Sequence, residues 1–208
     1  MRRAVPCSWF TAACCAARRS LRVFASVLAL ALAAPAYAAD RITLAEVSFA
    51  LAADGDGAAI NAQFDFALPR ALEDAVNRGI ALYFVVDFEM YRSRWYWFDR
   101  KVADQALTYR LTYSPLTRQY RLARGALAQP FDSLAEALAT LKRVRGWKVL
   151  ERSGLPTGDD PNAYRAQLRL RLDTSQLPKP FQVDALTNRD WVLTSDWQPL
   201  RPAPELFR

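Results

Sequence analysis

The chain has 208 residues, with 28 Lys and Arg against 21 Asp and Glu, and no histidine. Without histidine, the usual catalytic triads and the histidine-containing zinc sites are excluded. The formal charge of +7 is concentrated at the start, because residues 1–38 hold five arginines and no acid, which leaves a net charge of +2 on the other 170 residues. One globular unit of this size and charge gives no reason to expect nucleic acid as a partner.

Residues 1–38 predict a signal peptide. Two arginine clusters precede the uncharged apolar stretch 23–34, and the small-residue cleavage signal 36–38 follows it. The stretch has 12 residues, whereas a membrane-spanning helix needs about 20. We therefore expect export across the inner membrane to the periplasm, with cleavage after Ala38. The alternative is an uncleaved N-terminal anchor, which would be the only membrane contact of the chain.

The mature domain is expected over residues 39–198, and hydrophobic periodicity predicts its strands. Apolar and polar side chains alternate over residues 42–51, 60–66, 80–90, 107–113, 119–123, 147–151 and 164–172, with a less regular strand at 191–195. The tail, residues 199–208, holds three prolines and is expected to be loose.

Two helices interrupt these strands. The first begins at Pro69 and ends at Gly79, and the second begins with a capping box at residues 133–136, continues through Val144 and ends at Gly146. The apolar stripe of the second helix is centred on Leu138, and its end holds the cationic residues Lys142, Arg143 and Arg145. The order of elements predicts an α+β domain: a mostly antiparallel sheet or sandwich with two helices packed on it.

The sequence holds no Walker motif, no serine nucleophile motif and no glycine-rich dinucleotide motif. Residues 54–57 (Asp-Gly-Asp-Gly) resemble the start of a calcium loop. Ala59 stands where the loop needs glycine, however, and Asp65 where it needs glutamate. We therefore expect a hairpin turn at this position, and neither a metal nor a cofactor.

Two carboxylates, Asp87 and Glu89, share one face of a predicted strand at a separation of roughly 6–7 Å. Glycosidases use a similar spacing, so an open cleft lined by these two residues and Asp99 would indicate a carboxylate-based hydrolase. We favour the other interpretation, in which they form ion pairs with arginines of neighbouring strands, such as Arg110 and Arg121.

The most distinctive segment, residues 91–101, has four consecutive aromatic side chains between two arginines. Strand alternation predicts that Phe98 lies on the apolar face, unless a bulge near Arg92 exchanges the two faces. The opposite face is a candidate recognition surface for a sugar, a peptide or a partner protein, and it consists of Arg94, Trp95, Trp97, Asp99 and Arg100. The alternative is that both faces are covered and that the cluster is structural.

Five segments carry a family resemblance: residues 68–75, 82–86, 94–99, 116–121 and 172–183. They resemble exported proteins of Gram-negative bacteria that form the domain of unknown function 4390 family, and the resemblance covers nearly all of the mature chain. It implies no activity, cofactor or catalytic residue. Because such proteins are often encoded beside a membrane sensor histidine kinase, it implies an accessory role in the periplasm.

Three functions remain open. We favour a periplasmic binding or accessory module without catalytic activity, whose partner is a protein of the envelope or membrane, or another envelope ligand. The second is a structural or assembly factor of the envelope. The carboxylate-based hydrolase is the least favoured.

Overall fold

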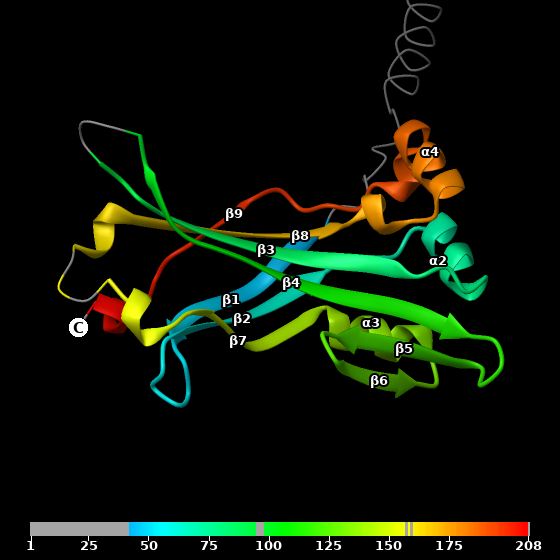
Figure 1. Ribbon diagram of the computed structural model, residues 1–208, viewed down its shortest axis with the longest axis horizontal. Coiled ribbons are helices and arrows are strands. Elements are labelled where there is room, and N and C mark those ends of the chain that lie inside the picture. Colours follow the sequence, from blue (N-terminus) through cyan, green and yellow to red (C-terminus); the bar gives the residue numbers. More distant parts are fainter. Residues whose placement is uncertain (1–41, 95–97, 157, 159, 208) are drawn as a thin grey trace, which may run out of the picture. The chain divides into compact units, whose positions relative to one another are not determined.

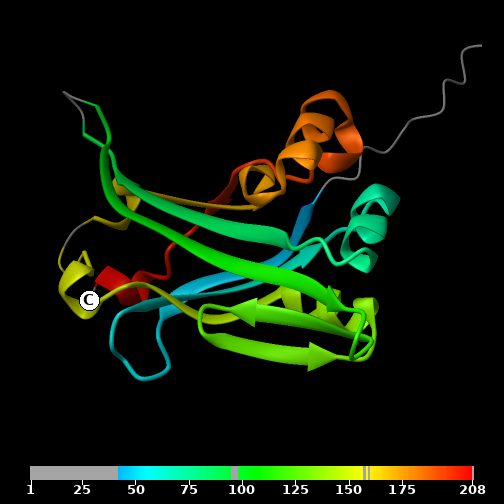
Figure 2. The same cartoon turned by 45° about the vertical axis from the view of Figure 1, so that its right-hand side comes forward.

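The computed structural model describes residues 42–94, 98–156, 158 and 160–207, which belong to one compact unit, Asp40–Arg208. The predicted signal peptide lies outside the described residues. Two antiparallel sheets face each other in this unit; the α-helices lie at one end of them, and short 3-10 helices lie at the other (Figures 1 and 2). Of the helices that the structure describes, none combines the length and the apolar character needed to cross a bilayer.

The smaller sheet has three strands in the order β1-β2-β7, and the larger has six in the order β6-β5-β4-β3-β8-β9. The smaller consists of β1 (Thr43–Leu51), β2 (Ala58–Asp65) and β7 (Arg143–Leu150). The larger consists of β3 (Leu82–Arg92), β4 (Arg100–Ser114), β5 (Gln119–Arg124), β6 (Leu127–Phe131), β8 (Tyr164–Leu172) and β9 (Gln198–Leu200). The predicted α+β class with mostly antiparallel strands is confirmed.

The core lies between the two sheets because each contributes one apolar face. On β3, every second side chain from Leu82 to Met90 is fully buried, as the alternation of the sequence predicts. Phe88 of this strand packs edge-on against Phe49 of β1, with ring centroids 5.3 Å apart, and against Trp147 of β7, at 6.4 Å. The strand at the centre of the larger sheet therefore carries the contact between the layers.

The structure describes three α-helices, and a proline or a capping box marks the start of each. They are α2 (Arg70–Asn77), α3 (Leu134–Leu141) and α4 (Lys179–Thr187). α2 starts after Pro69, and α3 starts at Ser133, whose hydroxyl accepts a hydrogen bond of 3.2 Å from the Glu136 backbone N–H, as the capping box predicts. The sequence predicts two helices, and α4 is a third that it does not predict. Pro178 lies at its N-cap and Pro180 in its first turn, where proline is tolerated.

The second predicted helix ends earlier than expected. α3 stops at Leu141, so Arg143, Val144 and Arg145 belong to β7. Leu138, the expected centre of the apolar stripe, is half-buried, whereas Leu141 is fully buried. The pairing of β7 with β2 satisfies the backbone hydrogen bonds that a longer helix would have made.

The tail after Pro199 was expected to be loose, but it packs against the core. Leu206 and Phe207 are buried, and the Phe207 ring lies 5.5 Å from that of Tyr164. The Ala203 N–H donates a hydrogen bond of 2.9 Å to the carbonyl oxygen of Phe49 in β1. The apolar side chains of the tail hold it against the core, and its prolines do not prevent this.

The Asp/Gly segment between β1 and β2 is a turn, as expected. The Asp54 carboxylate lies 2.6 Å from Lys148 Nζ of β7, and Asp56 lies 3.9 Å from the same nitrogen. Gly57 has φ +102°, and a Cβ atom there would overlap the carbonyl oxygen of Leu150, so this position requires glycine. Within the described ranges, no group of three or more Asp, Glu, His or Cys residues is placed to hold a metal ion.

Candidate functional site

Three residues of the predicted recognition surface are described in the structure, and they lie at the β3–β4 hairpin. Arg94, Asp99 and Arg100 are exposed near its tip, beyond the end of the sandwich that lies away from the helices (Figure 1). Trp95 and Trp97 lie outside the described residues, so the joint surface of the five side chains stays a prediction.

Phe98 of the same hairpin is 86% exposed, so the prediction that it shares the apolar face is wrong. The register between the two strands shifts near this point, because Met90 pairs with Ala103 whereas Tyr91 pairs with Lys101. The extra residue, Val102, is a β-bulge in β4. Phe98 itself lies between Arg92, where β3 ends, and Arg100, where β4 begins, so the alternation of a strand does not extend to it.

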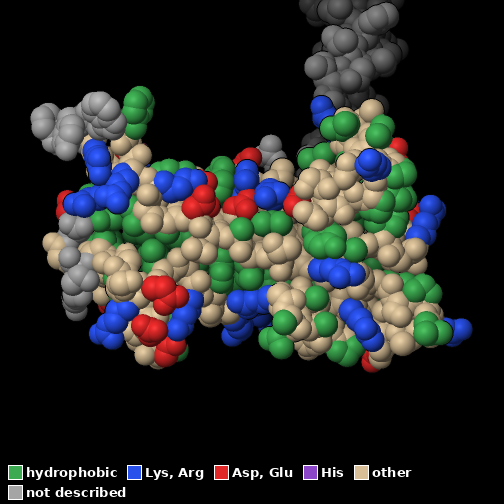
Figure 3. All heavy atoms as spheres, viewed as in Figure 1, with side chains coloured by type: hydrophobic (Ala, Val, Ile, Leu, Met, Phe, Trp, Pro, Cys, Tyr) green, Lys and Arg blue, Asp and Glu red, His purple; other side chains and the backbone are tan. Residues whose placement is uncertain are grey.

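Asp87 is held by two cations on the outer face of the larger sheet. Its Oδ2 lies 2.7 Å from Nη2 of Arg169 and 2.8 Å from Nε of Arg171, both on β8. The Arg169 guanidinium also lies 4.3 Å from the ring centroid of Trp197. Figure 3 shows acidic and basic side chains next to one another along this face. The expected ion pairs therefore form, but with β8 instead of Arg110 and Arg121.

Glu89 is held in a similar way. It accepts hydrogen bonds from Lys101 Nζ (2.9 Å), the Tyr91 hydroxyl (2.8 Å) and the Gln167 amide (2.8 Å). Burial raises the pKa of Glu89, but these three hydrogen bonds outweigh the effect, so its pKa is below the ordinary value. A carboxylate that stays ionised at neutral pH is poorly suited to donate a proton. Asp99 lines a depression of about 280 Å³ together with Tyr91 and Gln167, the residues that donate to Glu89, but neither Glu89 nor Asp87 lines it.

A further site, which no sequence pattern indicates, is built on β7. Two residues of β7, Arg145 and Gly146, lie opposite Asn61 of β2, which makes a β-bulge. Gly146 has φ +57°, and its N–H donates a hydrogen bond of 2.8 Å to Asn61 Oδ1. Because of the bulge, Val144 and Trp147 are both buried even though they are three residues apart. The arginines before it remain on the outer face.

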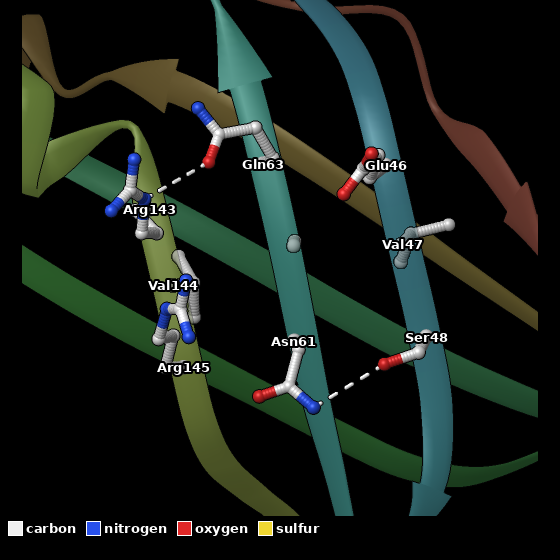
Figure 4. Close-up of a pocket in the computed structure, with 9 residues that line it drawn as sticks. Glu46, Val47, Ser48, Asn61, Gln63, Arg143, Val144 and Arg145 are labelled. Atoms are coloured by element: carbon white, nitrogen blue, oxygen red, sulfur yellow. Dashed lines mark hydrogen bonds between the residues drawn. The ribbon is translucent and has the colours of Figure 1, made fainter.

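The outer face of the smaller sheet is a polar trough of about 510 Å³ (Figure 4). Its polar lining consists of Glu46 and Ser48 from β1, Asn61 and Gln63 from β2, and Arg143 and Arg145 from β7. The Asn61 amide donates to the Ser48 hydroxyl at 3.3 Å, and Arg143 Nε donates to Gln63 Oε1 at 3.2 Å. Hydrogen bonds thus join the three strands across this face.

A second depression, a groove of about 640 Å³, borders the same two arginines and is formed by α3, β4, β5, β6 and β7. Its floor is apolar: Tyr109 and Leu122 are each 5% exposed, and Leu127 at the rim is 79% exposed. The groove exists because β5 and β6 extend the larger sheet past the smaller one, and α3 packs on only part of them (Figure 2).

Three arginines, Arg124, Arg143 and Arg145, surround this groove. In the part of the chain that the structure describes, none of them has a carboxylate partner, and the side-chain partner of Arg143 is the neutral Gln63. Burial raises the pKa of the Tyr109 hydroxyl, and the nearby Arg124 guanidinium partly offsets this effect. An apolar floor under uncompensated positive charge favours an anionic ligand with apolar parts.

Comparisons with known proteins give one match. The sequence profile described as "Domain of unknown function (DUF4390)" matches residues 39–201. No protein with a curated description and no solved structure matches the chain.

Proposed function

Because the chain belongs to the domain of unknown function 4390 family, whose description assigns no activity, we propose a function from its sequence and surface. The protein is an exported binding or accessory module of the cell envelope, and it acts by contact with a partner protein instead of by catalysis. Export rests on the signal-peptide pattern of residues 1–38.

One contrast in the charged side chains supports a binding role. The carboxylates that could do acid–base chemistry, Asp87 and Glu89, are engaged by Arg169, Arg171 and Lys101. Among the described residues, no carboxylate forms an ion pair with the arginines around the groove, although Glu46 lines the trough that Arg143 and Arg145 share. A protein surface with unmatched charge beside apolar side chains is suited to bind a ligand of the opposite charge.

The same contrast argues against the hydrolase. A retaining or inverting glycosidase needs one carboxyl group that is protonated at the working pH. The pKa of Glu89 is shifted downward, and Asp87 is bound by two guanidinium groups. Glu89 is therefore poorly suited to supply the acid, and Asp87 is engaged in an ion-pair network instead of facing a cleft.

The test combines localisation with capture in living cells. A photo-reactive residue is placed at Gln129, which is exposed in the groove, and as a control at Thr108, which is exposed on the outer face of β4. We expect an N-terminus near Ala39 by mass spectrometry, and a cross-link to one envelope protein from position 129 but not from 108. A membrane sensor histidine kinase, as implied by the family resemblance, would be identified in the same way. A cytoplasmic protein that keeps Met1, or no specific cross-link from either position, would contradict the proposal.

A further inference from the structure

The strand β7 has one unpaired edge, and that edge faces the groove. β7 pairs with β2 on one side. Besides Arg143 and Arg145 of β7, the residues that line the groove belong to α3, β4, β5 and β6, and none belongs to β2. Over the described residues, no strand is hydrogen-bonded to this side of β7, so its outward N–H and C=O groups can pair with an added strand.

The other sheet edges carry a proline or a hydrogen bond from the C-terminal segment, and β7 has neither on its free edge. β6 contains Pro130 and β9 is a three-residue strand that contains Pro199, and proline blocks strand addition. The edge of β1 receives the Ala203 N–H at the Phe49 carbonyl oxygen. β7 contains the bulge at Arg145 and Gly146 but no proline, and its exposed cations are Arg143, Arg145 and Lys148, of which Lys148 is paired with Asp54. This edge is therefore open to a partner that tolerates positive charge.

We propose that an extended, acidic segment of a partner protein adds as a strand to the groove-facing edge of β7. Side chains alternate along a strand, so every second residue of the segment would point onto Tyr109, Leu122 and Leu127. The residues between them would lie beside Arg143 and Arg145 on the outer face. The geometry thus calls for apolar residues that alternate with Asp or Glu. This inference rests on the proposed binding function and names the class of its ligand.

Charge decides between this ligand and a second copy of the chain. Two β7 edges placed side by side would bring the arginines of both copies together, and like charges on adjacent strands are destabilising. An acidic segment gains from the same arginines. An anionic lipid could use the apolar floor and the arginines, but it would leave the backbone groups of β7 unpaired.

The probe is a fluorescein-labelled peptide of ten residues in which valine alternates with glutamate, kept at nanomolar concentration. Its anisotropy is followed as the protein, expressed from its whole coding sequence, is added. We expect saturable binding that weakens at least about tenfold in the double variant Arg143→Ser/Arg145→Ser and in Leu127→Glu. The control Arg121→Ser changes an exposed arginine of β5 that does not line the groove, and it should leave binding unchanged. Circular dichroism and urea midpoints establish that each variant is folded.

Two further peptides test strand addition on the unaltered protein. One carries N-methyl groups at every glutamate and the other at every valine, so that each removes the backbone donors from one edge of the peptide. At least one should bind tenfold more weakly than the parent, and a valine–lysine peptide should not bind.

Equal binding of the parent and both N-methylated peptides, or no effect of the arginine variant, would overturn the inference. So would oleate that binds in an arginine-dependent manner while the peptide does not. If the peptide fails to bind but position 129 still cross-links to an envelope protein, strand addition is wrong and the proposed function stands.

Discussion

Replacing Phe88 by alanine tests the central contact of the sandwich. Its ring is fully buried and packs edge-on against Phe49 and Trp147. The matched control is Phe98→Ala, because Phe98 is the same residue type but 86% exposed. The two variants remove identical atoms, so the difference between them reports burial alone.

Removing a buried phenylalanine side chain costs about 3–5 kcal/mol. Each edge-to-face aromatic pair adds about 0.5–1.5 kcal/mol beyond its buried area. Phe88 makes two such pairs. Because the cost of truncating a buried phenylalanine already includes its ring contacts, these pairs place Phe88→Ala in the upper part of that range, at about 4–5 kcal/mol. Phe98→Ala should change it by less than about 0.5 kcal/mol, as exposed positions do.

Equilibrium unfolding in urea, followed by tryptophan fluorescence, measures both values. With a slope of about 2 kcal/mol per molar urea, Phe88→Ala should lower the midpoint by about 2 M, and Phe98→Ala should leave it within about 0.3 M. A loss below about 1 kcal/mol for Phe88→Ala would show that the sheets do not pack through this ring. An equal loss for both variants would refute the reasoning from burial.

Three further outcomes follow from the structure. Gly57→Ala should cost about 2 kcal/mol or more because its Cβ would meet backbone, whereas Gly55→Ala, with φ +70° and open space around it, should cost about 1 kcal/mol in the same urea assay. Glu89 has a lowered pKa in the folded state, so its contribution is present above its unfolded pKa of about 4.3 and is lost as the pH falls through the folded value. Urea midpoints measured from pH 7 down to pH 3 should therefore fall more steeply for the parent protein than for Glu89→Gln, and parallel curves would contradict the assignment. Leu141→Ala should cost about 2–5 kcal/mol by thermal or urea unfolding, and Leu138→Ala should cost clearly less because Leu138 is only half-buried; the reverse order would mean that the helix is rotated.

The elements that the sequence predicts well are those with an unambiguous local period. β3 alternates over its whole length, and its inner face is the centre of the core. The capping box at Ser133 places the start of α3 correctly. The end of that helix is not predictable from the local sequence, because the alternation Arg143-Val144-Arg145 is compatible with a strand as well as with the last turn of a helix. Pairing with β2, about 80 residues away in the chain, decides between them.

The candidate site was harder to predict for the same reason. That Asp87 and Glu89 would be paired was predictable from charge, but their partners depend on which strand lies beside β3. The arginines of β7 matter because β7 is an edge strand and because the larger sheet extends past it. Strand order is a property of the whole fold, and no local pattern in the sequence records it.

The most direct test of the account is amide hydrogen exchange along β7, with and without the valine–glutamate peptide. If an acidic strand adds to its free edge, amides within residues 143–150 that exchange quickly in the free protein should become protected, while those of β6 change little. Protection confined to the β3–β4 hairpin, or no change along β7 at a saturating peptide concentration, would contradict the claim that this edge is the binding site.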